Sequence, residues 1–355
     1  MKLGFGLYRH MLNKEHYRFA RQCGATHVVI HLTDYFRKTQ VNYDSDTQPV
    51  GGNTGWGFSV ANDNIWSLES LEAIKKGINV EGLELEAIEN FEPADWHDIL
   101  LDGPKKYEQI EGLKIIIQNM GEVGIPIMGY NFSIAGVASR ISGSFARGGA
   151  ESVGMNGEDQ TPIPNGMVWN MTYDQKAVSG EIKSFTHDEL WERVAWFINE
   201  IVPVAEKAGV RMAAHPDDPP LPFVRNTPRL VYQPALYQKL LDILPSANNT
   251  LEYCLGSLAE MTEGNIYEAT EQYARQEAIG YIHFRNVKDK VPNYKETFID
   301  EGVIDMRRIL KILKKNNYHG VLIPDHTPLM TCEAPWHAGM AYAMGYMNAL
   351  INEIQ

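Results

Sequence analysis

Residues 210–215 read VRMAAH, a short apolar run that ends on a side chain able to bind a metal ion. Three later runs have the same form: LEYC at 251–254, YIH at 281–283 and LIPD at 322–325. They end on a thiol, an imidazole and a carboxylate, all of which bind divalent ions in proteins. The four runs therefore predict one divalent-metal centre. Its predicted ligands are His215, Cys254, His283 and Asp325.

The same pattern of strand followed by helix runs through the whole chain. Buried strands are expected at 3–8, 26–32, 83–89, 125–132, 210–215, 250–256, 278–284 and 320–326. Helical spacing follows near 13–23, 67–80, 105–123, 188–209, 229–244, 266–279, 305–318 and 337–354. Apolar strands that alternate with helices indicate a parallel sheet covered by helices. Eight such units predict an α/β fold, the (β/α)8 or TIM barrel, whose working face lies at the C-terminal ends of the strands.

Two long polar segments interrupt this repeat, 33–66 after the second strand and 133–187 after the fourth. Both would emerge on the working face, where long loops shape or cover a site. We expect them to act as lids or as contacts within a homo-oligomer; the alternative for 133–187 is a disordered insertion. The expected anchors of the first segment are Trp56, Phe58 and Trp66.

Composition limits the classes of protein to which the chain can belong. No shift in composition divides it, so we expect one domain over residues 1–355. The formal net charge of −13 argues against nucleic acid or an anionic membrane as the main partner. No apolar run approaches ~20 residues, no signal sequence opens the chain, and three scattered cysteines form no disulfide framework. A soluble cytoplasmic protein is therefore expected.

Several motifs resemble those of the mannonate dehydratases. They are HPDDPP at 215–220, CLGS at 254–257, HFRN at 283–286, PDH at 324–326 and GYNF at 129–132. That family consists of metal-dependent barrels of the xylose-isomerase-like group, which convert D-mannonate to 2-keto-3-deoxy-D-gluconate. The resemblance spans most of the chain but is strong only in the motifs. It implies a hydro-lyase that acts on a small sugar acid.

The resemblance also implies roles for single residues. It places His215, Cys254, His283 and Asp325 as metal ligands, His326 as a catalytic acid or base, and Asn131 and Arg285 at the substrate. The family's usual ion is Mn²⁺, whereas a donor set with sulfur favours Zn²⁺, Fe²⁺ or Co²⁺. Further substrate-binding candidates are Tyr130, Asp217, Asp218 and Glu89.

Loss of water beside a carboxylate sets the chemistry that these residues must perform. A carbon acid next to a carboxylate is very weak, so a metal must stabilise the charge that develops as the C2 proton leaves. One group takes that proton and another protonates the departing C3 hydroxyl. His326 could serve in one of these roles, and Arg285 could hold the substrate carboxylate through two parallel hydrogen bonds.

The chain departs from the family near the chemistry. A catalytic tyrosine expected after the Asp-His pair is absent from the matching segment, APWHAG at 334–339. His337 or Tyr342 could replace it, although Tyr342 is also at a spacing typical of packing. The segment ETFIDEG at 296–302 stands where the family is rich in histidine, and Leu255 stands where threonine is usual. These departures leave the exact substrate and the loss of water open.

Other readings of the same residues also remain open. Asp217 and Asp218 could be turn caps, Glu89 could contact the substrate or support a ligand, and Asp305 is expected to be an N-cap. His31 and Asp34 could face the cavity. For the whole protein, the alternatives are a sugar isomerase or epimerase of the same barrel group and a non-catalytic metal-binding or sugar-binding barrel.

Overall fold

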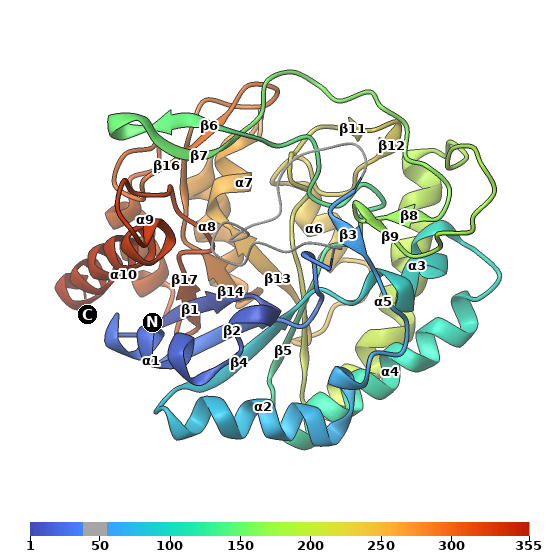
Figure 1. The fold of residues 1–355 in the computed structure, drawn as a ribbon, viewed down its shortest axis with the longest axis horizontal. Helices are drawn as coiled ribbons and strands as arrows, with labels where there is room; N and C mark the ends of the chain where they lie inside the picture. Colours follow the sequence, from blue (N-terminus) through green and yellow to red (C-terminus); the bar gives the residue numbers. More distant parts are fainter. Residues whose placement is uncertain (38–54, 355) are drawn as a thin grey trace.

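The computed structural model describes residues 1–37 and 55–354, and its centre is a closed parallel barrel (Figure 1). The hydrogen-bonded order of the strands is β1-β17-β14-β13-β10-β5-β4-β2. Their bounds are β1 (Lys2–Leu7), β2 (His27–His31), β4 (Glu84–Glu89), β5 (Ile127–Tyr130), β10 (Arg211–Ala214), β13 (Asn249–Cys254), β14 (Ile279–His283) and β17 (Val321–Ile323). The predicted TIM barrel and its eight strands are confirmed.

Helices surround this barrel where the apolar spacing predicts them. They are α1 (Lys14–Gln22), α2 (Leu68–Val80), α4 (Lys106–Val123), α5 (His187–Ala208), α6 (Leu236–Leu241), α8 (Ile266–Arg275), α9 (Met306–Lys315) and α10 (Pro335–Ile354). Asp305 accepts a hydrogen bond from the backbone N of Arg308 at 2.9 Å, so the predicted N-cap of α9 is confirmed. None of the described helices is both long and apolar enough to span a bilayer.

Two helices were not predicted, α3 (Pro93–Leu101) and α7 (Leu255–Glu260). The chain turns from β13 directly into α7, and the sulfur of Cys254 accepts a hydrogen bond from the backbone N of Ser257 at 3.5 Å. The expectation that this strand continues to residue 256 is therefore wrong. An apolar run of LGSLA fits a buried strand and a buried helix equally well, and periodicity cannot separate them.

The barrel interior is filled by side chains from successive strands, and this packing fixes the direction of each strand end. Its cluster consists of Val29, Ala87, Ile127, Ala213, Tyr281, Val321 and Ile323. Alternate residues of a strand share a face, so the residue two positions later also points into the barrel. Those next inward residues include His31, Glu89, His215, His283 and Asp325, all at the C-terminal ends of the strands.

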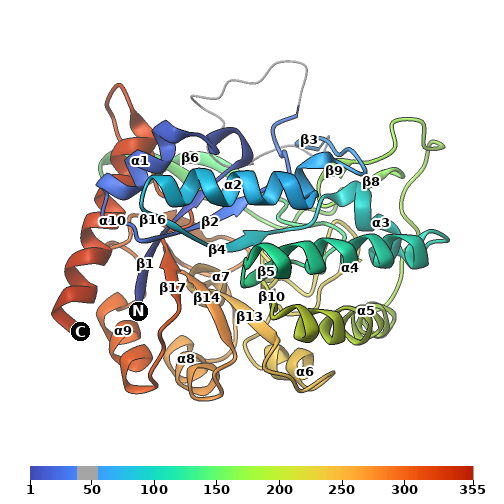
Figure 2. The ribbon, with the colours of Figure 1, turned by 90° about the horizontal axis from the view of Figure 1, so that it is seen from below.

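The described residues of the two long segments form small sheets. Residues 141–154 form β6 (Ile141–Ala146) and β7 (Ala150–Gly154), which join β16 (Lys295–Thr297) and β15 (Asn286–Lys288) in one sheet. A second small sheet consists of β3 (Gly57–Phe58), β9 (Met171–Thr172) and β8 (Met167–Val168). The strands β11 (Phe223–Val224) and β12 (Thr227–Pro228) form a separate two-stranded hairpin. Figure 2 shows β3, β6, β8, β9 and β16 gathered at the same end of the barrel. The alternative of a disordered insertion at 133–187 is therefore wrong.

The predicted anchors of the first long segment differ in how deeply they are buried. Trp56 and Trp66 are buried, each 4% exposed, and Trp56 packs on Trp169 from the second long segment with a ring separation of 5.9 Å. Phe58 is 36% exposed, so its prediction as an anchor is wrong. Residues 38–54, which include part of the predicted lid, lie outside the described residues.

Candidate metal centre and active site

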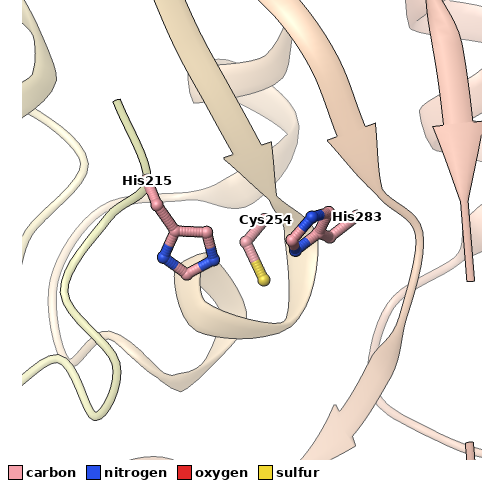
Figure 3. A group of neighbouring side chains, drawn as sticks. All are labelled: His215, Cys254 and His283. Carbon is pink, nitrogen blue, oxygen red and sulfur yellow. The ribbon is translucent and has the colours of Figure 1, made fainter. Parts of the chain in front are cut away.

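Three of the four predicted metal ligands converge at the ends of β10, β13 and β14. Figure 3 shows the sulfur of Cys254 between the imidazole rings of His215 and His283. One potential ligand atom from each lies within 4.8 Å of the others. His215 Nδ1 is 2.6 Å from the carbonyl oxygen of Pro216, so a proton on Nδ1 would leave Nε2 for a metal ion. Two imidazoles and a thiol form a donor set that fits a divalent ion.

The electrostatics of this trio favour the thiolate. Burial raises the pKa of Cys254, but Arg285, His215 and His283 outweigh it and hold the pKa well below its usual range. Neither ring nitrogen of His283 has a hydrogen-bond partner, although the side chain is only 3% exposed. A deprotonated sulfur beside unsatisfied buried nitrogens is the chemical environment of a metal ligand set.

Asp325 lies beside the trio through its contact with His283. Its Oδ2 is 3.5 Å from His283 Nδ1, 3.3 Å from Arg285 Nε and 3.2 Å from His326 Nε2. Burial opposes ionisation, but His326, His283 and Arg285 lower the pKa of Asp325 to about 2. The carboxylate is therefore ionised at neutral pH, as its predicted role as a fourth ligand requires.

A cavity opens above the trio and has two walls of different character. Aromatic rings form one wall: Tyr8, Tyr35, Trp56 and Trp169. Polar groups form the rest of the lining, where the predicted residues Asn131, Asp218, Glu89, His326 and His31 are joined by Arg140 and Glu252. A ligand of this cavity would meet both charged groups and ring faces. That combination suits a polyhydroxy acid, whose C–H faces can pack on aromatic rings.

His326 is held in place by a carboxylate that the sequence did not identify. Its Nδ1 lies 2.7 Å from Glu296 Oε2, and its Nε2 lies 3.5 Å from Arg140 Nη1. Burial raises the pKa of Glu296, but His326, Arg285 and Arg140 lower it below its usual value. An ionised carboxylate on Nδ1 fixes the orientation and tautomer of the ring. The sequence signalled Glu296 only as the start of the segment that replaces the family's histidines.

The two arginines at the site have different surroundings. Arg285 is 3% exposed, does not line the cavity, and bonds to Asp218 at 2.6 Å and to Glu260 at 2.9 Å. Its planar group is thus already held by carboxylates of the protein, and its predicted role as a clamp for the substrate carboxylate is not supported by these contacts. Arg140, from the second long segment, lines the cavity and is better placed for that role.

Two predicted substrate contacts point elsewhere. Tyr130 follows Gly129 on β5, and because Ile127 points inward, Tyr130 points outward. Its ring packs on Phe197 of α5 at 5.3 Å. Asp217 accepts hydrogen bonds at 2.7 Å from the backbone N of Leu230 and of Val231, which is a structural role in the loop. The predictions of Tyr130 and Asp217 as substrate contacts are wrong. Asp217 has a structural role, but its bonds reach residues 230 and 231 and do not cap the turn at Pro219-Pro220, as the alternative expected.

The predicted replacement for the missing tyrosine also lies away from the cavity. His337 is on α10, where its ring packs on Phe19 of α1 at 4.7 Å and on Trp336 at 4.9 Å. Its prediction as a catalytic residue is therefore wrong, because nearness in sequence to Asp325 does not bring it to the barrel mouth. Asp34 is likewise absent from the cavity lining and accepts a hydrogen bond from the backbone N of Phe36 at 3.2 Å.

A different tyrosine lines the cavity. Tyr8 follows β1, in which Gly4 and Gly6 lie against inward-pointing side chains of the neighbouring strand β17. Alternation therefore directs the Tyr8 ring into the barrel, where it lines the cavity. It stacks on His31 with a ring separation of 4.8 Å. Burial, followed by the charge of Asp325, raises the pKa of Tyr8 far above its usual range, so its phenol stays protonated. Its place at the end of the expected strand 3–8 was the available sequence signal.

A pair of buried glutamates lies beside His283. Glu89 ends β4, and Glu252 precedes Cys254 by two residues on β13. His283 Nε2 is 3.2 Å from Glu89 Oε1 and 3.4 Å from Glu252 Oε1. The sequence identified Glu89 but missed Glu252, which alternation places on the same inward face as Cys254.

Comparisons with known proteins agree on one family. The family model for D-mannonate dehydratase (UxuA) matches residues 35–142 and 160–355. The mannonate dehydratase of Streptococcus equi subsp. zooepidemicus is 30% identical over 282 residues, which cover 76% of this chain and 77% of that protein. The one from Lactococcus lactis subsp. cremoris is 27% identical over 341 residues, covering 88% and 94%.

Solved structures give the same result for the fold. The crystal structure of mannonate dehydratase from Streptococcus suis serotype 2 matches with a TM-score of 0.75 and 25% identity, covering 100% of this chain and 93% of that one. An L-ribulose 3-epimerase matches with a TM-score of 0.58 and 15% identity, covering 99% and 95%. The second likeness concerns the barrel alone.

Proposed function

The chain belongs to the mannonate dehydratase family, and on that premise we propose that it removes water from a sugar acid. The substrate is D-mannonate or a close relative, and the product is the corresponding 2-keto-3-deoxy acid. The observation that carries this proposal is the trio His215, Cys254 and His283, whose two histidines line a cavity together with His326. Loss of water beside a carboxylate requires a metal ion and nearby acid/base groups, and these residues could supply both.

The proposed ion is divalent and is held by His215, Cys254, His283 and Asp325. Mn²⁺ is proposed from the family, with Zn²⁺, Fe²⁺ or Co²⁺ as the ions that the sulfur ligand would favour. When bound, the ion would supply positive charge to stabilise the negative charge that develops on the substrate carboxylate. Arg140 would pair with the same carboxylate from the polar wall.

His326 and Tyr8 are the proposed proton-transfer groups. Glu296, 2.7 Å from Nδ1 of His326, would keep the ring proton on Nδ1, so the lone pair of Nε2 would take the proton from C2 of the substrate. Tyr8, which lines the cavity, would donate its phenolic proton to the departing C3 hydroxyl. Burial raises the pKa of Tyr8 and opposes this transfer, whereas the charge of Arg140 lowers that pKa and would stabilise the phenolate. Tyr35 is less suited to that role, because its hydroxyl lies 3.3 Å from His31 Nδ1, to which it can donate instead. The resulting enol would tautomerise to the keto acid.

Product analysis by mass tests the proposal directly. The purified chain, loaded with Mn²⁺, is incubated with D-mannonate and a panel of aldonic and uronic acids, with the His326→Ala variant as the matched control. We expect a 2-keto-3-deoxy acid that is lighter than its substrate by one water and is not formed by the variant. A product of unchanged mass would identify an isomerase or epimerase instead. Inactivity towards the whole panel would favour a non-catalytic barrel.

A further inference from the structure

We propose that the barrel holds a second divalent cation, bound by Glu89, Glu252 and the Nε2 atom of His283. One potential ligand atom from each of these three side chains lies within 4.8 Å of the others, and all three side chains are buried. Three different strands, β4, β13 and β14, supply them from within the barrel. This carboxylate site would share His283 with the trio.

The two nitrogens of His283 face different groups. Nδ1 is 3.5 Å from Asp325 Oδ2, whereas Nε2 is 3.2 Å from Glu89 Oε1 and 3.4 Å from Glu252 Oε1. Neither nitrogen has a hydrogen-bond partner of acceptable geometry. Nδ1 is thus left for the ion of the trio and Nε2 for the ion of the carboxylate site.

The balance of buried charge favours a cation beside the glutamates. The carboxylates around the site are Glu89, Asp218, Glu252, Glu260, Glu296 and Asp325. Arg285 pairs with Asp218, Glu260, Glu296 and Asp325, and Arg140 pairs with Glu296. Among the residues that the structure describes, the ion-pair partners of Glu89 and Glu252 are all histidines.

A buried carboxylate without a cation is costly, so this pair must be neutralised in some way. Glu89 is 4% exposed and Glu252 is 1% exposed, and one oxygen of each has no hydrogen-bond partner. A divalent cation would satisfy the nitrogen and both carboxylates together.

The two sites would select different ions. Two imidazoles and a thiolate form a soft donor set, which favours Zn²⁺, Fe²⁺ or Co²⁺. Two carboxylates and one imidazole form a harder set, which suits Mn²⁺ or Mg²⁺. We therefore expect Zn²⁺ at the trio and Mn²⁺ at the carboxylate site when both metals are present.

Metal stoichiometry of the full chain tests this proposal. The chain is stripped with a chelator, incubated with Mn²⁺ alone, with Zn²⁺ alone or with both, desalted and measured by elemental analysis. With both metals we expect about two ions per chain, one of each kind. Glu252→Gln should keep the Zn²⁺ and lose the Mn²⁺, because the amide removes a charge at almost constant volume. Cys254→Ser, the matched variant of the other site, should lose Zn²⁺ and keep Mn²⁺.

Absorption of the Co²⁺-loaded chain reports the trio separately, because a Co²⁺–thiolate bond gives its own charge-transfer band. We expect this band to survive Glu252→Gln and to vanish in Cys254→Ser. If Glu252→Gln does not fold, Glu89→Gln takes its place. Saturation at one ion per chain in the wild type would overturn the proposal, whether or not the variants lose that ion. These readouts need no substrate, so saturation at one ion per chain in a sample with dehydratase activity would refute the second site and leave the proposed function intact.

Discussion

The floor of the site and its walls are built in different ways. The floor consists of side chains at the ends of barrel strands, such as His215, Cys254 and His283, whose positions are fixed by the sheet. Much of the wall comes from the long segments, as with Arg140 and Trp169, whose positions depend on small sheets packed over the barrel mouth. Chemistry that needs accurate geometry thus lies on the rigid part, and contacts that select a substrate lie on the variable part.

The strongest test of this division is to remove a floor residue. Cys254→Ser should lose the ion bound at the trio and lower turnover by about 10³-fold or more, because a catalytic metal supplies several kcal/mol of charge stabilisation. Elemental analysis and steady-state assays of the same sample measure both effects. Circular dichroism should show an unchanged fold. Full activity with Cys254 replaced would place the metal elsewhere.

Next in size is the loss of a proton-transfer group that lies between floor and wall. His326→Ala should lower turnover by about 10²-fold or more while the metal content stays unchanged. Tyr8→Phe should have an effect in the same range if the phenol supplies the second proton. The two rates and the metal content are measured under the same loading conditions. Loss of metal in His326→Ala would make that residue a ligand, and unchanged turnover in Tyr8→Phe would exclude the phenol.

A wall residue should affect binding more than chemistry. Arg140→Gln should raise KM for a sugar acid by about 10- to 100-fold, because a hydrogen bond to a charged group contributes about 1.5–3 kcal/mol. Its effect on kcat should be smaller. Arg140→Lys is the control, since it keeps the charge but loses the planar pair of donors. An unchanged KM in both variants would show that a cation other than Arg140 binds the substrate carboxylate.

A smaller effect, on the free energy of unfolding, is expected at Asp63, which binds residues that follow the first two barrel strands. Asp63 Oδ2 accepts hydrogen bonds from Arg9 Nη1 at 2.7 Å and from Arg37 Nη2 at 3.1 Å. Burial opposes ionisation, but Arg9, the backbone N of Ile65 and Arg37 lower the pKa of Asp63 to about 2. Because the folded pKa lies below the unfolded value of 3.8, this stabilisation is complete above pH 3.8 and is lost as the pH falls through about 2.

Asp63→Asn measures that contribution. We expect it to lower the free energy of unfolding at pH 7 by about 1 kcal/mol, a value reduced for solvent screening because the carboxylate is only partly buried. The difference from the wild type should shrink at acidic pH. Denaturant titrations at neutral pH and near pH 3 give both values. A difference that grows at low pH would contradict the assigned sign.

The smallest effect is expected outside both regions. His337→Ala should change turnover by less than about 2-fold, because the ring packs between α1 and α10 and does not line the cavity. Steady-state kinetics with the wild type as reference measure this. A loss comparable to that of His326→Ala would restore the original prediction of a catalytic role.

Strand alternation explains which site residues the sequence could predict. His215, His283 and Asp325 each follow an inward core residue by two positions, so reading the strand ends was sufficient to find them. The same rule would have rejected Tyr130 and found Glu252, two residues before Cys254. His337 was predicted from its nearness in sequence to Asp325, which carries no information about direction once the chain has entered a helix.

The barrel and the strand ends that bring His215, Cys254 and His283 together could be predicted from the residues alone, because both depend on local alternation and on the parallel alignment of strand ends. The positions of Arg140, Glu296 and Tyr8 beside the cavity became known only from the folded chain. Arg140 belongs to the 133–187 segment that carries β6 and β7, and Glu296 lies on β16 in the same small sheet as those strands. The pairing of strands so far apart in sequence depends on long-range packing, which no local pattern of residues encodes.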